Sequence, residues 1–153
     1  MHRIRDWLYI GNYREAGDEL LLRSREISAV LHLIFGITLP PDIERLCTPV
    51  ADGTWIPIEQ LERGVAFVRA QKAAGRKVLI ACAAGISRST SFTMAVLHEE
   101  EGLNLLEAYR TIHEVHPNAQ PHPALLRSLI QYYKDPMTLE ELFKAMRAIT
   151  RGI

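Results

Sequence analysis

The segment VLIACAAGISRS, residues 78–89, decides the fold and indicates where function would lie. Its first four residues are short and wholly apolar, which is typical of a strand buried on both faces of a parallel sheet. After Gly85 the apolar residues recur at helical spacing up to Gly102. The segment therefore predicts a strand, a tight loop of small residues and a helix. In open α/β sheets, ligands bind at such carboxyl ends of strands.

Outward from this segment, strands alternate with helices, and helices alone follow. Strands are predicted at residues 7–10, 27–34 and 46–50, and helices at 15–25 and 58–75. Capping pairs predict two later helices, and a proline turn leads into another between them: Asn104 with Glu107 for a helix ending near His116, Pro121-His122-Pro123 for the turn, and Thr138 with Glu141 for the last helix. This order predicts an α/β fold with a central, mostly parallel sheet flanked by helices.

Composition excludes several classes of protein. The chain has 153 residues, with 18 Lys and Arg against 18 Asp and Glu, and only two cysteines. Such a length can form one core without metal or disulfides, and zero net charge argues against nucleic acid or an anionic membrane as partner. No apolar run approaches the roughly 18 residues of a membrane span, and the N-terminal residues do not resemble a signal peptide. We therefore expect a cytoplasmic protein with reduced thiols.

The loop after the predicted strand combines a nucleophile with an anion site. Small residues at a helix N-terminus present unpaired backbone N–H groups and the positive end of the helix dipole. The same field favours the thiolate of Cys82, and Arg88 can hold two oxygens of a phosphate. The spacing from cysteine to arginine is weak evidence by itself, and a buried, inert cysteine is the alternative. Gly85, Ser87 and Ser89 strengthen the functional interpretation; without Gly-Lys-Ser/Thr the loop is not a nucleotide P-loop.

These residues resemble the signature of the cysteine-dependent protein tyrosine phosphatases, and within them the small dual-specificity phosphatases. Residues 7–11 are similar to the family's opening strand and residues 27–33 to its second core strand. Residues 102–109, followed by His116-Pro117, match a later helix and the proline that ends it. The resemblance implies a phosphatase-like three-layer sandwich and one catalytic domain over residues 1–153. Residues from about 134 to 153 would be a C-terminal helical extension.

The resemblance also implies a role for each site residue, with neither metal nor cofactor. Cys82 would attack phosphorus, Ser89 would stabilise the leaving thiolate, and Asp52 would be the general acid and later the general base. Asp52 lies on a predicted loop 30 residues before Cys82; its alternative role is to form the Asp-Gly turn. The phosphate oxygens would be held by the loop residues, namely Ala83, Ala84, Gly85, Ile86, Ser87 and Arg88.

Two positions depart from the family pattern. Ala81 stands where the family has a histidine that braces the loop and favours the thiolate, and His122 stands where relatives often have Asn. The loss at position 81 predicts either a slower phosphatase with a more alkaline optimum or a phosphate-binding module with little turnover. We favour the enzyme, because nucleophile, arginine, hydroxyl and acid are all retained. A rhodanese-like sulfurtransferase is the enzymatic alternative, although it has no use for Asp52.

The loop lacks the lysines that multiply phosphorylated substrates usually require. The expected partners are therefore a phosphorylated protein, on tyrosine and serine or threonine, or a small phosphate monoester, with inorganic phosphate or another oxyanion binding at the loop. By resemblance, a chain of this length has no insertion to deepen the pocket. Trp55 and Ile56 are candidates for one wall of the pocket, with plain packing as the alternative role of Trp55.

Three other groups of residues could suggest chemistry. Cys47 could serve as a resolving thiol for Cys82, although a small buried residue is the commoner role. The run of residues 113–116 with His122 contains three histidines, but it lacks the spacing of a metal site, so we expect no metal. The acidic run of residues 99–101 is interpreted as a solvated helix face.

Overall fold

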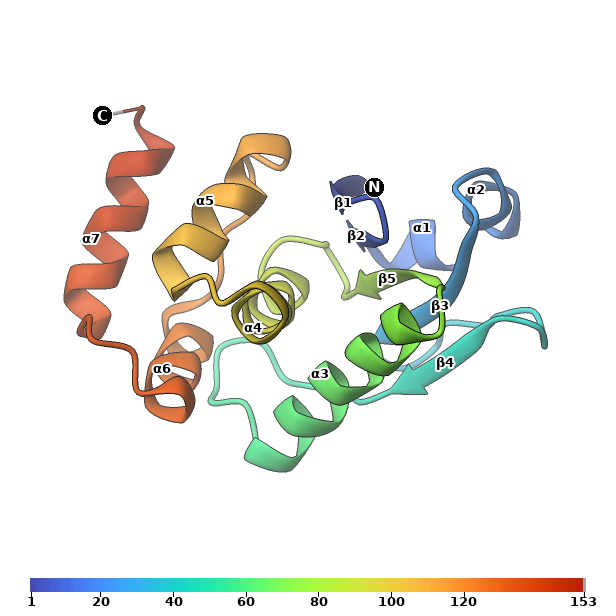
Figure 1. Cartoon of the computed structure of the whole chain (residues 1–153), viewed down its shortest axis with the longest axis horizontal. Helices are drawn as coiled ribbons and strands as arrows, with labels where there is room; N and C mark the ends of the chain where they lie inside the picture. Colours follow the sequence, from blue (N-terminus) through green and yellow to red (C-terminus); the bar gives the residue numbers. More distant parts are fainter. Residues whose placement is uncertain (153) are drawn as a thin grey trace.

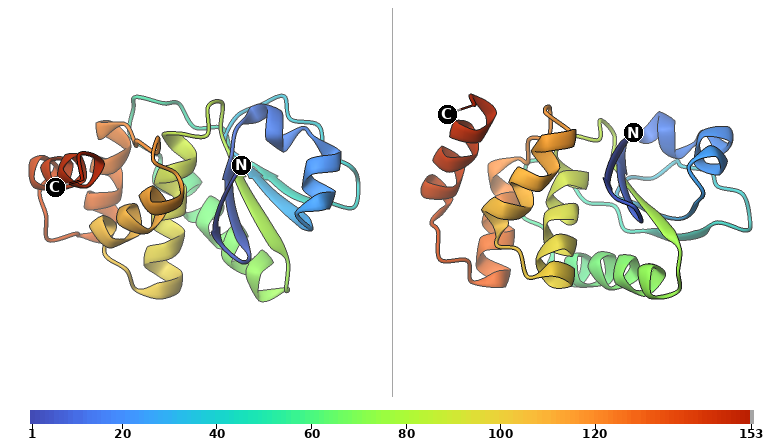
Figure 2. Two further views of the ribbon diagram at one scale, coloured as in Figure 1. Left: turned by 90° about the horizontal axis from the view of Figure 1, so that it is seen from above. Right: turned by 45° about the horizontal axis from the view of Figure 1, so that its top comes forward.

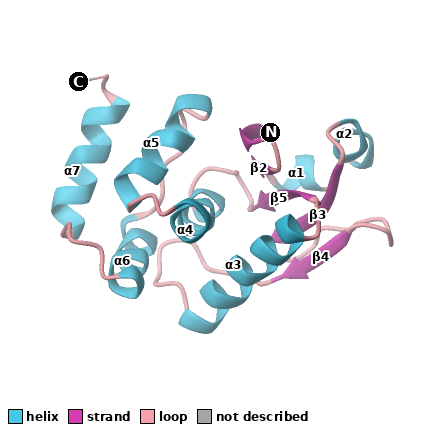
Figure 3. Ribbon diagram, viewed as in Figure 1, coloured by secondary structure: helices cyan, strands magenta, loops and turns pink. Residues whose placement is uncertain are grey.

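The computed structural model describes residues 1–152, and its centre is a five-stranded sheet in the order β1-β2-β5-β3-β4. The strands are β1 (His2–Arg5), β2 (Leu8–Gly11), β3 (Ile27–His32), β4 (Glu44–Cys47) and β5 (Lys77–Ala81). β5 pairs in parallel with both β2 and β3, β4 is parallel to β3, and only β1 is antiparallel. The mostly parallel sheet predicted from the sequence is therefore confirmed (Figure 3).

Seven helices accompany the sheet in the described part of the chain. They are α1 (Tyr13–Ala16), α2 (Glu19–Ser24), α3 (Ile58–Ala73), α4 (Arg88–Glu101), α5 (Leu105–Val115), α6 (Pro123–Tyr133) and α7 (Leu139–Thr150). Figures 1 and 2 show α1 and α2 on one side of the sheet and α3 and α4 on the other, with α5, α6 and α7 stacked beyond α4. The expected three-layer α/β arrangement is thus present.

Two buried clusters fill the spaces between the layers. The smaller cluster lies under α1 and α2 and includes Leu22, Leu79 and Ala81. The larger cluster joins the opposite face of the sheet to α3 through α7 and includes Ile80 and Phe92. In α4 every side chain from residue 89 to 97 is buried, so this helix is the centre of the second layer. Both faces of β5 are consequently covered, in agreement with its uninterrupted apolar sequence.

The structure corrects the sequence prediction at the N-terminal end and in one later strand. β1 was not predicted because only Ile4 of its four residues is buried, which leaves no alternation to detect. The single helix expected at residues 15–25 is two short helices, separated at Gly17 and restarted by the capping side chain of Asp18. The strand expected at 46–50 lies at Glu44–Cys47. Pro49 has no N–H to donate to a ladder.

The capping predictions are confirmed for both later helices. Asn104 and Glu107 form a reciprocal capping box at the start of α5, and Thr138 and Glu141 form one at the start of α7. Within α7, Leu142 and Met146 are buried against the helical layer. Whether the residues from about 134 onward are an addition to the family domain stays a prediction. No helix within residues 1–152 has both the length and the apolarity needed to cross a membrane.

The acidic run at the end of α4 is not simply solvated, which corrects the sequence interpretation. Glu100 accepts hydrogen bonds from Arg69 and Lys72 of α3, each at 2.7 Å. Glu101 accepts from Arg5 Nε of β1 at 2.8 Å. Since partly exposed ion pairs contribute about 0–1 kcal/mol each, these contacts mainly fix how α4 meets its neighbours.

Candidate active site

The predicted loop connects β5 to α4 and surrounds the candidate nucleophile. Cys82 directly follows β5, its side chain is 1% exposed, and its Sγ lies 3.2 Å from the hydroxyl of Ser89. Arg88 is the first residue of α4. The structure therefore brings together Cys82, Arg88 and Ser89 as the sequence predicted. At this distance the Ser89 hydroxyl can donate a hydrogen bond to the Cys82 sulfur when the sulfur is ionised.

The loop amides point inward because the loop carbonyls are bonded outward. The carbonyl of Ala83 accepts from Tyr13 N at 3.2 Å, that of Ile86 accepts from Gln120 N at 3.0 Å, and that of Gly85 bonds His116 Nε2 at 2.7 Å. In a trans peptide the N–H is directed away from the C=O. The following amides, at residues 84, 86 and 87, therefore face the opposite side, where an anion would lie.

Gly85 is required by its backbone and by its surroundings. Its φ is +70°, a left-handed conformation that favours glycine. A Cβ at this position would lie 2.9 Å from the backbone C and O of Gly11 and 3.0 Å from Asn12 N. The loop is thus packed directly onto the turn that follows β2. This contact explains why the chain needs a glycine here, which the sequence motif alone did not explain.

His116 is a site residue that the sequence analysis missed. Its side chain is 4% exposed, and because a carbonyl can only accept, Nε2 must carry the proton that is donated to Gly85. Burial lowers the pKa of His116, with the hydrogen bond to Gly85 opposing that effect. Its ring also stacks on His2 at 3.8 Å between ring centroids. The sequence signal was only a histidine before the helix-ending proline, with no sign of its distant partner.

Asp52 is held against the loop by Ser87. The Ser87 hydroxyl accepts from His122 N at 2.9 Å, so its proton is available for Asp52 Oδ1, which lies 2.8 Å away. If Asp52 is the general acid, its other carboxyl oxygen would carry the proton. His122 Nδ1 accepts from Ala124 N at 3.0 Å and caps α6. The position unlike the family therefore forms part of the site's framework.

Arg88 and Asp52 are linked through the same loop. Arg88 Nη1 donates to the carbonyl of Val50 at 3.1 Å, two residues before Asp52. The candidate acid, nucleophile and arginine line one cavity of about 340 Å³. Its lining consists of the loop and the two segments that face it: Asp52, Cys82, Ala83, Ala84, Ile86, Ser87, Arg88, Gln120, Pro121, His122 and Pro123. Gly85 is buried beneath the loop and supports this lining.

Comparison with known proteins identifies the family of this chain. Residues 8–135 match the family described as dual specificity phosphatase, catalytic domain. The chain belongs to this family. Human dual specificity protein phosphatase 16 is 32% identical over 136 residues, covering 86% of this chain and 20% of that protein. Dual specificity protein phosphatase 18 of Pongo abelii is 30% identical over 128 residues, covering 82% and 68%.

Solved structures agree with the dual-specificity phosphatase assignment. A variant of human DUSP28 superposes with a TM-score of 0.80 at 27% identity, covering 87% of this chain and 93% of that chain. The crystal structure of DUSP15 has the same TM-score at 25% identity and covers 99% and 95%. A mouse protein complexed with zinc tungstate gives 0.79 at 27% identity, covering 97% and 90%. The domain is therefore a protein phosphatase domain, and the sulfurtransferase alternative is not favoured.

The structure shows what lies beside the family's missing histidine. Ala81 is in register with His32 of the neighbouring strand β3, so both side chains lie on the same face of the sheet. His32 is 6% exposed, and neither ring nitrogen has a hydrogen-bond partner among the described residues. Burial lowers the pKa of His32. An uncharged imidazole thus lies on the strand beside the one that carries Cys82.

Cys47 is poorly placed to protect Cys82. Cys47 pairs with His32 in register, and His32 pairs with Ala81, which puts two strand spacings, roughly 10 Å, between Cys47 and the end of β5. A disulfide needs Cα atoms within about 7 Å. The Cys47 thiol instead donates to the carbonyl of Ile34 at 3.6 Å, and burial raises its pKa. These observations favour the structural role.

The histidines that superficially resembled a metal site have separate functions. His116 bonds the carbonyl of Gly85, whereas His122 caps α6. Within residues 1–152, no group of three or more His, Cys, Asp or Glu side chains could together hold a metal ion.

Proposed function

We propose that this domain hydrolyses phosphate monoesters of phosphorylated proteins, on tyrosine and on serine or threonine, through a phosphocysteine at Cys82. The observation that carries the proposal is the shared cavity lined by Cys82, Arg88 and Asp52, beside a loop whose carbonyls at 83, 85 and 86 are bonded elsewhere, which leaves the following amides as donors for an anion. Such donors stabilise charge on phosphoryl oxygens without reorganising during the reaction. The tungstate complex of the mouse relative supports oxyanion binding at this fold.

The first step transfers the phosphoryl group to the enzyme. The Cys82 thiolate forms a bond to phosphorus as the bond from phosphorus to the substrate oxygen breaks, while Arg88 and the amides hold the equatorial oxygens. Asp52 gives its proton to the departing oxygen, which leaves as an alcohol or phenol. The Ser87 hydroxyl at 2.8 Å keeps Asp52 above the loop for this transfer.

The second step returns the enzyme to its starting state. Asp52, now a carboxylate, takes a proton from water as the water oxygen attacks phosphorus and the bond from sulfur to phosphorus breaks. The Ser89 hydroxyl, 3.2 Å from Sγ, donates to the thiolate that is released. Inorganic phosphate leaves, and every proton is accounted for by Asp52 and water.

The expected substrate carries a single phosphate. No lysine lines the cavity, and Arg88 is its only Arg or Lys side chain among the residues described. A phosphoprotein or a small phosphate monoester therefore fits better than a polyphosphorylated ligand. A cytoplasmic location is part of this proposal.

An aryl phosphate assay with a chelator present tests the mechanism. The wild type should turn over without added metal, and Cys82→Ser should be inactive. Asp52→Asn should lose about 10²–10⁴-fold in kcat on an alkyl phosphate, and much less on a nitrophenyl phosphate, because a good leaving group needs little protonation. Equal losses on both substrates would contradict the role of Asp52. Phosphate binding that requires Arg88, with no turnover at any pH, would instead indicate a binding module.

A further inference from the structure

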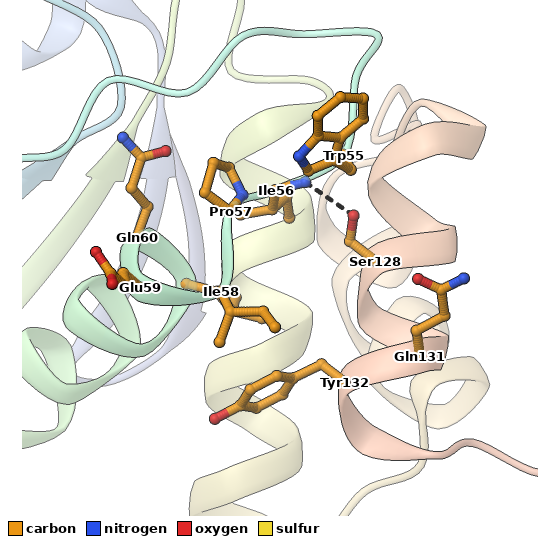
Figure 4. Close-up of a pocket in the computed structure, with 10 residues that line it drawn as sticks. Trp55, Ile56, Pro57, Ile58, Glu59, Gln60, Ser128, Gln131 and Tyr132 are labelled. Carbon is orange, nitrogen blue, oxygen red and sulfur yellow. Dashed lines mark hydrogen bonds between the residues drawn. The ribbon is translucent and has the colours of Figure 1, made fainter.

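An apolar groove lies beside the loop that carries Asp52, outside the catalytic cavity. It has a volume of about 650 Å³ and lies between the start of α3 and α6 (Figure 4). Trp55 and Ile58 line it and are 73% and 60% exposed, and Tyr132 faces them from α6. Large apolar side chains that are exposed together beside a cavity usually mark a binding site.

The walls of this groove are fixed by hydrogen bonds across it. Ile56 N donates to the hydroxyl of Ser128 at 2.8 Å (Figure 4). This hydroxyl donates in turn to the carbonyl of Ala124 in α6. Gln60 Nε2 donates to the carbonyl of Pro49 at 3.0 Å. The acid loop is therefore anchored to α6 on one side and to α3 on the other. The groove is preformed, which reduces the entropy lost on binding.

The groove and the catalytic cavity are neighbours, with a third cavity between them that shares a lining residue with each. Trp55 also lines a middle cavity of about 380 Å³, together with the exposed side chain of Arg127. Pro123 lines this middle cavity and the catalytic cavity alike. A track therefore runs from the phosphate site, past a positive charge, to an apolar end. Residue 55 is three positions from Asp52, so their Cα atoms lie within roughly 11 Å.

We propose that this track binds the polypeptide that flanks the phosphorylated residue of a protein substrate. The groove between Trp55, Ile58 and Tyr132 accepts a large apolar side chain, and Arg127 faces an acidic one between that anchor and the phosphate. An extended peptide advances about 3.3 Å per residue, which places the anchor roughly two to five residues from the phosphorylated residue. The inference rests on the proposed function and adds to it a preference for substrates with an apolar residue near the phosphorylated one.

A second copy of this chain is a less suitable occupant. A stable dimer usually buries about 800 Å² on each partner. The groove instead joins two exposed apolar side chains to a polar rim that includes Glu59 and Gln131. A single anchoring side chain in an extended peptide fits these dimensions.

Matched phosphopeptides test the proposal. The probes are pairs of acidic phosphotyrosine peptides. The two peptides of a pair differ only in having Leu or Ala at one position, and the pairs cover positions two to five on each side of the phosphotyrosine. For the wild type we expect one placement of Leu to raise kcat/KM about tenfold over Ala, equivalent to about 1.4 kcal/mol. In Ile58→Asp this ratio should fall to about one. Asp suits the first turn of α3, because acidic residues favour helix N-termini, so the variant should fold.

Leu20→Asp is the matched control. Leu20 is 83% exposed, lies in the first turn of α2 and does not line the groove. It should leave both the peptide ratio and the aryl phosphate activity at wild-type values. Within each variant the ratio cancels losses that affect both peptides equally. Arg127→Gln should lower kcat/KM for acidic peptides more than for their neutral counterparts.

The outcomes separate this inference from the proposed function. If the wild type has no phosphatase activity on any probe, both the proposed function and the peptide groove are refuted. Normal aryl phosphate turnover with a ratio near one at every position, or a ratio unchanged by Ile58→Asp, would refute the groove alone. Concentration-dependent dimers in ultracentrifugation that Ile58→Asp abolishes, combined with no preference for Leu, would also overturn it in favour of self-association.

Discussion

Replacing His116 by Phe removes the hydrogen bond that orients the phosphate-binding loop while keeping a ring of similar size. The ring of Phe can still stack on His2, as His116 does at 3.8 Å. What is lost is the 2.7 Å bond to the buried carbonyl of Gly85. The peptide that follows this carbonyl supplies the amide of Ile86, so a loop free to turn here would lose a donor to the phosphoryl oxygens.

The magnitude of this change can be estimated for stability and for catalysis separately. An unpaired buried carbonyl costs about 1–3 kcal/mol. Phe also removes His116 Nδ1, which is buried without a hydrogen-bond partner in the described part of the chain, and this gain offsets some of the cost. We therefore expect the free energy of unfolding to fall by about 1–2 kcal/mol. One oxyanion donor is worth about 10²–10³ in kcat, and partial loss of its orientation predicts a fall in kcat/KM of roughly 10–100-fold.

The assay combines urea unfolding with aryl phosphate kinetics at a temperature where every variant is folded. His116→Gln should recover much of the activity, because its amide can donate from about the position of Nε2. His113→Phe is the control: His113 lies one turn earlier, in α5, and its ring packs on Tyr109 at 5.8 Å between centroids, so kcat/KM should stay near the wild-type value. If His116→Phe loses stability but keeps kcat/KM within twofold, the loop does not depend on this brace and the reasoning is refuted.

Two further predictions concern the same loop and its buried histidines. Gly85→Ala should be much less stable than Gly75→Ala in urea unfolding, because both glycines have positive φ but only the Cβ at position 85 would meet backbone, at 2.9 Å; equal losses would show that only φ matters. Burial lowers the pKa of His32 and of His116 below the ordinary value of about 6.5. The unfolded chain therefore binds more protons just below that pH, so stability should be complete above about pH 6.5 and fall as the pH drops below it. His32→Leu should flatten this decline in urea titrations at several pH values, and an unchanged slope would contradict the assignment.

The sequence predicted the fold class because β5 and α4 carry strong, consistent patterns. An apolar run covered on both faces, a small-residue loop and a long buried helix leave few alternatives. Capping boxes at Asn104 and Thr138 located two helix starts correctly, since these signals depend on residues only three positions apart. β1 was missed because its pairing with β2, rather than a pattern of its own, defines it.

The site was predictable where the chemistry is local and not where it depends on distant contacts. Cys82, Arg88 and Ser89 lie within eight residues of sequence. Their proximity follows from the loop that connects β5 to the first turn of α4. Asp52 could be placed only through the family resemblance, and the structure adds its bond to Ser87. The role of His116 could not be predicted, because 31 residues separate it from Gly85.

Ala81 replaces the histidine that the family has at this position, and the structure shows which other histidines lie near the loop. The sequence indicates only that a loop-bracing histidine is missing. The structure shows one histidine, His116, bonding the loop from α5's end, and another, His32, buried beside Ala81. Since burial lowers the pKa of both imidazoles, neither is expected to provide a cationic ring beside the loop near neutrality.

Trapping the phosphoenzyme is the most direct test that Cys82 is the nucleophile of this loop. The enzyme is mixed with a radiolabelled phosphorylated substrate, quenched in denaturant during turnover, and digested to locate the label. We predict one phosphate per chain on the peptide that contains Cys82, none in Cys82→Ser, and a larger trapped fraction in Ser89→Ala, in which the thiolate leaves more slowly. Turnover that continues in Cys82→Ser, or wild-type turnover with no label on that peptide, would contradict the mechanism.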